Sequence, residues 1–183
     1  MNDLAAHDPR TFVTHDTDTP PPAGRDAIDA MHARWSTLRP DLDLEPMAVV
    51  GRLLRLVPLL MARCETFLEP HGLSRAEFDL LTALRRTDRP VSPGELTRQL
   101  LFTGPATTKR LRRLEDTGWI TRRANPDDAR GFLIEPTPDG ARRFDALLPR
   151  YVAFEATLIE TLDPAARADL ADHLRTLLVA VEP

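Results

Sequence analysis

The chain has 183 residues, of which 42% are apolar, and a formal net charge of −4 at pH 7. This length supports one main core with appended helices better than two independent domains. No apolar run approaches the roughly 20 residues that cross a membrane, the first residues do not resemble a signal or transit peptide, and the single cysteine, Cys64, excludes an internal disulfide. We therefore expect a cytoplasmic protein with no membrane partner.

The charge is unevenly distributed along the chain. Residues 85–130 contain eleven Arg or Lys and six Asp or Glu, a net charge of +5, whereas residues 1–45 contain four and nine, a net charge of −5. A local excess of positive charge favours a polyanionic partner such as nucleic acid. The negative charge of the whole chain therefore does not exclude nucleic-acid binding.

The first 45 residues divide into a tail and a helix. Residues 1–24 are rich in Asp, Thr and Pro and bury too few apolar side chains to order themselves, so we expect a flexible tail. Residues 25–45 are expected to form an added N-terminal helix, over 25–38, and a linker. The helix carries an apolar stripe of Ile28, Met31, Trp35 and Leu38.

Residues 46–70 are predicted to form a strongly apolar helix. Its apolar side chains are Val50, Leu53, Leu54, Val57, Leu60, Met61, Cys64 and Phe67. They cover more surface than one neighbouring helix can bury, which indicates a subunit interface. Pro58 lies inside this helix and is expected to kink it. We interpret Cys64 as an inert buried residue rather than an oxidation sensor.

Two capping motifs predict the next two helices. Ser74 and Glu77 form a capping box that begins a helix ending near residue 86, with Phe78 among its inward side chains. Ser92, followed by Pro and with Glu95 three residues later, begins a short helix over 93–100. Both starts satisfy backbone N–H groups that a helix leaves without partners.

A third, basic helix is predicted over 105–116. Gly104 lets the chain turn, Pro105 presets the helical backbone, and Gly118 ends the helix. The packing face carries Thr107, Leu111 and Leu114, whereas Thr108, Lys109, Arg112 and Arg113 point elsewhere. One face therefore packs and another can meet phosphate.

A hairpin and two long helices complete the chain. Residues 119–123 and 131–135 are predicted strands joined across 125–130. Helices over 138–162 and 164–181 follow, each opened by a proline and each carrying an apolar stripe.

This order of elements resembles the DNA-binding core of the MarR family of bacterial transcription regulators. The resemblance rests on Glu95 and Leu96, on residues 104–111 followed by 114–115 and Gly118, and on the hairpin segment 126–131. Asn125 replaces the family's usual Asp at the start of the wing. The resemblance implies a mainly α fold with a small β-hairpin wing: a winged helix-turn-helix over 71–137, a dimerisation helix over 46–70, and C-terminal dimerisation helices over 138–183.

The resemblance implies a homodimeric transcription regulator, expected to act as a repressor, that binds double-stranded operator DNA. The residues expected at DNA are Thr107, Thr108, Lys109, Arg112 and Arg113 on the basic helix, and Asp128 and Arg130 on the wing. Arginine on an inserted helix suits the guanine edge in the major groove. Arg130, held by Asp128, suits the minor groove.

Four further residues, Trp35, Asp79, Arg110 and Arg122, resemble the effector site of the urate-responsive subgroup of this family, which also carries an added N-terminal helix. An aromatic wall and guanidinium donors suit a planar, oxygen-rich anion, and a nearby acid would be repelled by it. The expected effector is a small anion such as urate or a related purine. The resemblance of residues 39–52 to other branches of the subgroup leaves a tricarboxylate, citrate or aconitate, as an alternative, and an aromatic acid also stays open.

Other interpretations of these features stay open. The basic helix is also compatible with a solvated face, and each of the four effector-site residues alone fits a core, surface or phosphate-binding role. A winged helix used only for protein contacts is the rival class. The five histidines form no close pair of metal ligands, and the chain has neither a P-loop nor a nucleophile elbow, so we expect no metal, no cofactor and no enzymatic activity.

Overall fold

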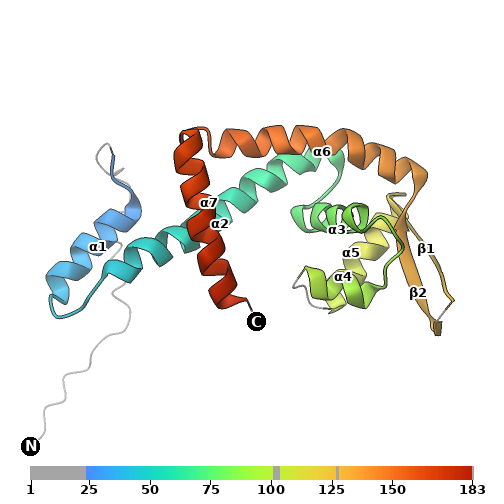
Figure 1. Cartoon of the computed structure of the whole chain (residues 1–183), viewed down its shortest axis with the longest axis horizontal. Helices are drawn as coiled ribbons and strands as arrows, with labels where there is room; N and C mark the ends of the chain where they lie inside the picture. Colours follow the sequence, from blue (N-terminus) through green and yellow to red (C-terminus); the bar gives the residue numbers. More distant parts are fainter. Residues whose placement is uncertain (1–23, 101–103, 127, 183) are drawn as a thin grey trace, which may run out of the picture. The chain divides into compact units, whose positions relative to one another are not determined.

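The computed structural model describes residues 24–100, 104–126 and 128–182, with the backbone alone at residues 129 and 130. In chain order the elements are α1 (Ala27–Leu38), α2 (Glu45–Leu68), the short 3-10 helix η1 (Glu69–His71), α3 (Arg75–Thr87), α4 (Pro93–Gln99), α5 (Gly104–Asp116), β1 (Ile120–Asn125), β2 (Asp128–Pro136), α6 (Pro138–Leu158) and α7 (Pro164–Val181) (Figure 1). The mainly α fold with one hairpin is therefore confirmed. The predicted tail lies outside the described residues, except for Gly24.

The chain divides into two compact units, and the division falls between Val57 and Pro58, inside α2. In the first unit α1 packs on the beginning of α2. Arg52 forms ion pairs with Asp26 at 2.8 Å and with Asp29 at 2.7 Å. Ile28 is buried and lies so close to Gly51 that a Cβ atom there would be 3.3 Å from its Cδ1. Charge pairing and a close backbone approach together hold the added helix on α2.

The core of the second unit joins the end of α2 to α3 and α6 through aromatic side chains. Phe67 stacks on Phe154 with ring centroids 4.5 Å apart, and Phe78 meets Tyr151 at 4.3 Å. Phe78 and Tyr151 are both buried, as the inward position of Phe78 predicted. This cluster supports the helix-turn-helix elements from one side.

The capping motifs confirm the starts of α3 and α4. Ser74 and Glu77 form the reciprocal capping box, and the Ser92 hydroxyl accepts the backbone N–H of Glu95. Gly118 adopts the left-handed conformation with φ of 73° and ends α5. α5 begins at Gly104, one residue before the predicted start. Figure 1 shows α3, α4 and α5 gathered beside the hairpin.

The hairpin is longer than predicted. Its antiparallel register pairs Arg122 with Ile134 and Ala124 with Phe132, and then moves to Asn125 opposite Asp128. Residues 129–131 of β2 therefore form a bulge at the wing tip. Beyond this bulge the two strands pair once more, at Asn125 and Asp128, outside the predicted strand ends. Ile134 also exchanges two backbone hydrogen bonds with Val91, in the link between α3 and α4, and thereby ties the hairpin to the helices.

The C-terminal helices begin as predicted, at Pro138 and Pro164. α6 ends at Leu158, earlier than expected, because residues 159–162 turn before the Asp163 cap of α7. Gly140, in the first turn of α6, packs against the backbone carbonyl of Trp119: a Cβ atom there would lie 2.0 Å from that oxygen. None of the helices within the described residues combines the length and apolar character needed to span a membrane.

Candidate nucleic-acid interface and anion site

The outer face of α5 carries exposed cations. Thr108, Lys109 and Arg112 are exposed, and the Thr108 hydroxyl donates to the carbonyl of Gly104 at 3.1 Å. Among the residues that the structure describes, Lys109 and Arg112 form no ion pair. Cations that no carboxylate neutralises keep their full attraction for phosphate. This face suits a polyanion.

Thr107 is a correction to the predicted DNA contacts. Thr107 is 1% exposed and lies on the same face as Leu111 and Leu114, which are equally buried. A side chain buried in the core cannot reach a groove of DNA. Thr107 therefore belongs to the packing face of α5, as its spacing with the two leucines indicated.

Arg113 has an internal partner that the sequence did not reveal. Its Nη1 donates to both carboxylate oxygens of Glu77 at 3.2 and 3.1 Å, and its Nη2 donates to the carbonyl of Gly72 at 3.3 Å. Glu77 is only 2% exposed, and its carboxylate also accepts the backbone N–H and the hydroxyl of Ser74. A buried carboxylate needs such neutralisation. Arg113 thus ties α5 to the start of α3, and its role at DNA stays a prediction.

The wing tip is shaped around Asp128. A Cβ atom at Gly131 would lie 2.8 Å from Oδ2 of Asp128, so the carboxylate occupies the space that a side chain at position 131 would need. The side chain of Arg130 lies outside the described atoms, and its contact with DNA stays a prediction. Arg123, which precedes the wing tip on β1, is exposed, and its Nε lies 3.9 Å from Oε2 of Glu135.

Arg122 points back toward α5, on the opposite face of β1 from Arg123. Its Nε lies 2.9 Å from Oε2 of Glu115, and its guanidinium stands 4.6 Å from the centre of the Phe132 ring. The Arg122 side chain is 29% exposed and that of Arg123 52%, because successive side chains of a strand point to opposite faces. Despite the short distance to Glu115, the buried Nε is not aligned for a hydrogen bond with any described group.

Asp79 lies half-buried on α3 beside Arg75, with Oδ1 2.9 Å from Nη2. Burial raises the pKa of Asp79, Arg75 opposes that rise, and the nearby Glu65 adds to it. Arg75 also donates to the Tyr151 hydroxyl at 3.1 Å. Burial, together with a hydrogen bond involving Cys64, moves the pKa of Tyr151 above its usual range.

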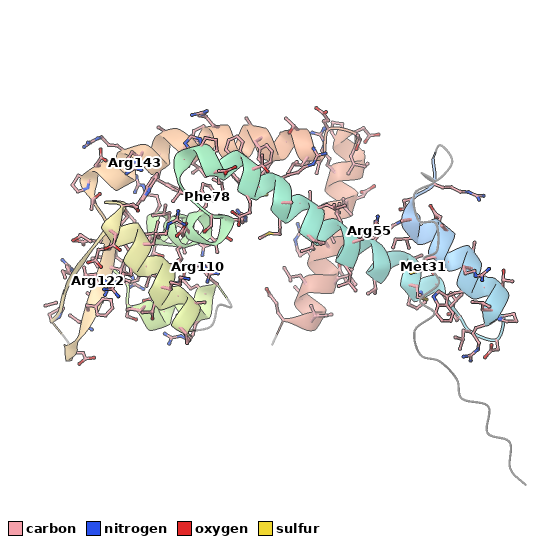
Figure 2. The ribbon with its side chains drawn as sticks, turned by 180° about the vertical axis from the view of Figure 1, so that it is seen from behind. Met31, Arg55, Phe78, Arg110, Arg122 and Arg143 are labelled. Carbon is pink, nitrogen blue, oxygen red and sulfur yellow. The ribbon has the colours of Figure 1, made fainter. Side chains whose placement is uncertain are left out.

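The four predicted effector residues come from both units. Trp35 lies on α1 in the first unit and is 43% exposed, whereas Asp79 on α3, Arg110 on α5 and Arg122 on β1 lie in the second. Figure 2 shows Arg110 on α5 and Arg122 on the hairpin. The ion-pair partners of Asp79 and Arg122, namely Arg75 and Glu115, lie outside the predicted set. Spacing along the chain gave no signal for Glu115, because a carboxylate near a helix end is usually solvated.

Comparisons with known proteins agree with this architecture. A model of the MarR family matches residues 71–131, which contain α3, α4, α5 and most of the hairpin. The HTH-type transcriptional regulator PecS of Dickeya dadantii is 33% identical over 151 residues, covering 81% of this chain and 89% of that protein. The multiple antibiotic resistance protein MarR of Salmonella typhimurium is 37% identical over 93 residues, covering 50% of this chain and 64% of that protein.

Solved structures extend the likeness to the fold. A mutant MarR from E. coli, crystallised with operator DNA, aligns with a TM-score of 0.64 and 28% identity over 75% of this chain and 99% of that one. AbsC from Streptomyces coelicolor, at 21% identity, shares the fold with a TM-score of 0.67 over 76% of this chain and 95% of that one. Since the PecS similarity runs through most of both chains and the family segment coincides with the helix-turn-helix and its hairpin, the chain belongs to the MarR family and is a DNA-binding transcription regulator.

Proposed function

We propose that this regulator is a homodimeric repressor that leaves its operator when a small anion such as urate binds beside the wing. The observation that carries the effector part is Arg122, a guanidinium at the base of the wing that points toward the recognition helix rather than outward. In this proposal residues 71–137 bind DNA, while residues 46–70 and 138–183 join the two subunits.

Exposed apolar side chains support the dimer. They lie on α2 (Val49, Val50, Leu54, Leu56, Val57, Leu59 and Met61) and on α7 (Leu170, Leu174, Leu177, Leu178, Val179 and Val181). No residue of α7 is buried within the described part of the chain. Apolar surface of this extent on a helix indicates a protein interface. A two-fold dimer presents two copies of α5, which suits a pseudo-palindromic operator.

The four proposed effector residues, grouped by the resemblance to the urate-responsive subgroup, comprise one aromatic residue and charges of both signs. Arg122 and Arg110 supply guanidinium groups that can hold the oxygens of a planar anion, and Trp35 supplies an exposed aromatic face. Asp79 would be repelled by a bound anion, and Arg110 lies on α5 itself. Ligand binding therefore has a direct path to the recognition helix. The same guanidinium groups fit citrate or aconitate, or an aromatic acid such as salicylate, as the alternative effectors.

The test measures operator binding with and without urate, xanthine, hypoxanthine, citrate, aconitate or salicylate, together with the melting temperature. A true effector raises the melting temperature by mass action and lowers operator affinity. Arg122→Ala should lose both responses while its operator affinity falls by no more than about threefold, the scale of one partly exposed ion pair, and Trp35→Ala should lose both responses with its operator affinity retained. Arg123→Ala is the matched control, because the Arg123 side chain lies on the face of β1 opposite to Arg122. Asp79→Ala should bind the effector but release DNA less completely.

Two results would contradict the proposal. If none of the six compounds changes the melting temperature or the operator affinity, the anion-sensing function is wrong. If the Arg122 and Arg123 variants respond alike, the site lies elsewhere. DNA binding has its own check: operator affinity should fall steeply as salt is added, because each phosphate that the protein neutralises releases counterions.

A further inference from the structure

We propose that the ion pair between Glu115 and Arg122 is a latch that holds the recognition helix α5 in position for DNA binding, and that an anionic effector opens it by replacing Glu115 at Arg122. The first part depends only on the geometry of the pair and on DNA binding. The second part rests on the proposed function. The pair is thus both a positioning device and an internal competitor of the effector.

The pair joins three elements. Glu115 lies in the last turn of α5, Arg122 is in β1, and the Arg122 guanidinium faces the ring of Phe132 on β2 at 4.6 Å. The chain between the two charges turns at Gly118 and is closed by the backbone hydrogen bond from Trp119 to Leu114 at 2.9 Å. One guanidinium therefore connects the end of the recognition helix to both strands of the wing.

The geometry of the pair allows an anion to replace the Glu115 carboxylate at Arg122. The Nε of Arg122 is 2.9 Å from the Glu115 carboxylate but makes no hydrogen bond to any described group. An arginine carries five N–H donors, and a planar anion that meets two of them in line binds better than a carboxylate held off the donor axis. The Glu115 side chain is 37% exposed, so its carboxylate can be hydrated once the anion has displaced it.

Opening the latch leaves α5 folded but less constrained. Leu111 and Leu114 keep the helix in the core, since each is 1% exposed. The open state lacks the tie between the helix end and the wing, the two elements that must meet DNA together. Simple electrostatics predicts the opposite effect, because removing a negative charge from a helix that approaches phosphate should strengthen DNA binding. The sign of the change therefore distinguishes the latch from a surface charge.

The first experiment needs no effector. Operator affinity is measured for the full-length Glu115→Gln, Arg122→Gln and double variants, with Asp116→Asn as the matched control. Asp116 is exposed on the same helix turn and has no ion pair among the described residues. Glu115→Gln should weaken operator binding by about threefold, the scale of one partly exposed ion pair, and Asp116→Asn should not weaken it. If both residues act only through their pair, the double variant should bind the operator as tightly as the single variant with the lower operator affinity.

The second experiment measures urate and citrate affinity of the same proteins by calorimetry. Glu115→Gln should bind the effector about threefold more tightly than the original protein, because no internal carboxylate competes, whereas Arg122→Gln should bind it weakly and Asp116→Asn unchanged. The latch is wrong if Glu115→Gln binds the operator as tightly as the unsubstituted protein or more tightly. Unchanged effector affinity in Glu115→Gln overturns the competition. If neither compound binds any of these proteins, the sensing function fails, and the operator measurements still decide the latch.

Discussion

Glu77 is a buried acidic residue, only 2% exposed, and Arg113 is the cation that neutralises its carboxylate. The Arg113 side chain itself is 56% exposed, so the pair is buried on one side only. The stability that it contributes is therefore smaller than that of a fully buried pair. Arg113 therefore has a structural role as the partner of Glu77, and its contact with DNA stays a prediction.

The two neighbouring arginines of α5 should separate stability from DNA binding. Arg113→Ala leaves a buried carboxylate unpaired and should lower the free energy of unfolding by about 2 kcal/mol. Arg112→Ala should leave stability within about 0.5 kcal/mol and weaken operator binding by about 1 to 3 kcal/mol if it holds a base edge. Urea denaturation and operator titration give the two numbers. Equal stability of the two variants would contradict the role of the Glu77 pair.

Asp79 makes stability depend on pH with a defined sign. Its pKa in the folded protein is raised above the value of 3.8 expected for the unfolded chain, chiefly by burial. The folded state therefore binds the proton more tightly, and Asp79 destabilises the fold progressively as pH rises from 3.8 through the folded pKa. Asp79→Asn removes this penalty at neutral pH, although it also weakens the pair with Arg75.

The expected result is a more stable Asp79→Asn protein near pH 7, with an advantage that shrinks as pH is lowered toward about 4. The measurement is urea denaturation of both proteins across that interval. Glu65 and Arg75 face Asp79 and are unchanged in both proteins, so the difference reports the Asp79 carboxyl. An advantage that is constant with pH, or that grows toward low pH, would exclude this explanation.

At the scale of elements, two helices begin with a proline and a glycine in the first turn but tolerate different substitutions. A Cβ atom at Gly140 of α6 would lie 2.0 Å from the Trp119 carbonyl oxygen, whereas at Gly94 of α4 the nearest atom is Nη1 of Arg98 at 3.7 Å. The backbone of Trp119 cannot move aside as easily as the long side chain of Arg98. Gly140 is therefore the point at which α6 is fitted to the base of the wing.

Gly140→Ala should lower the free energy of unfolding by about 2 kcal/mol or more through overpacking. Gly94→Ala, the matched control, should be neutral or stabilise by about 0.4 to 1 kcal/mol, because alanine has less backbone freedom to lose on folding. Thermal and urea denaturation compare the two. Similar stability in both variants would show that α6 can shift away from Trp119 at no cost.

The whole molecule leaves an apolar stripe on α7 without a partner in the described part of the chain. Leu177 and Leu178 are 44% and 53% exposed. Leu178→Glu should weaken the proposed dimer by about tenfold to a hundredfold, since burying one leucine contributes about 1.5 to 3 kcal/mol. Thr176→Glu adds the same charge on the other side of α7 and should leave the dimer intact. Sedimentation across a dilution series measures the dissociation, and a monomer in all three proteins would contradict the dimer.

Local features were predictable because their causes lie within a few residues. The Ser74 and Ser92 caps follow from hydrogen bonds between residues three apart. The stop at Gly118 follows from the left-handed backbone that glycine allows, and the inward side of Arg122 follows from strand alternation. Burial of Thr107 also followed from its helical spacing, and only the family resemblance had placed it at DNA.

The partners of charged and backbone groups were decided by tertiary structure alone. Arg113 meets Glu77 across 36 residues of sequence, Val91 pairs with Ile134, and Gly140 meets Trp119. The sequence shows that a carboxylate or a glycine is present, but which group faces it depends on how helices and hairpin pack. The same holds for Glu115 and Arg122: strand alternation turned the arginine inward, and only the approach of the wing to the end of α5 supplied the carboxylate.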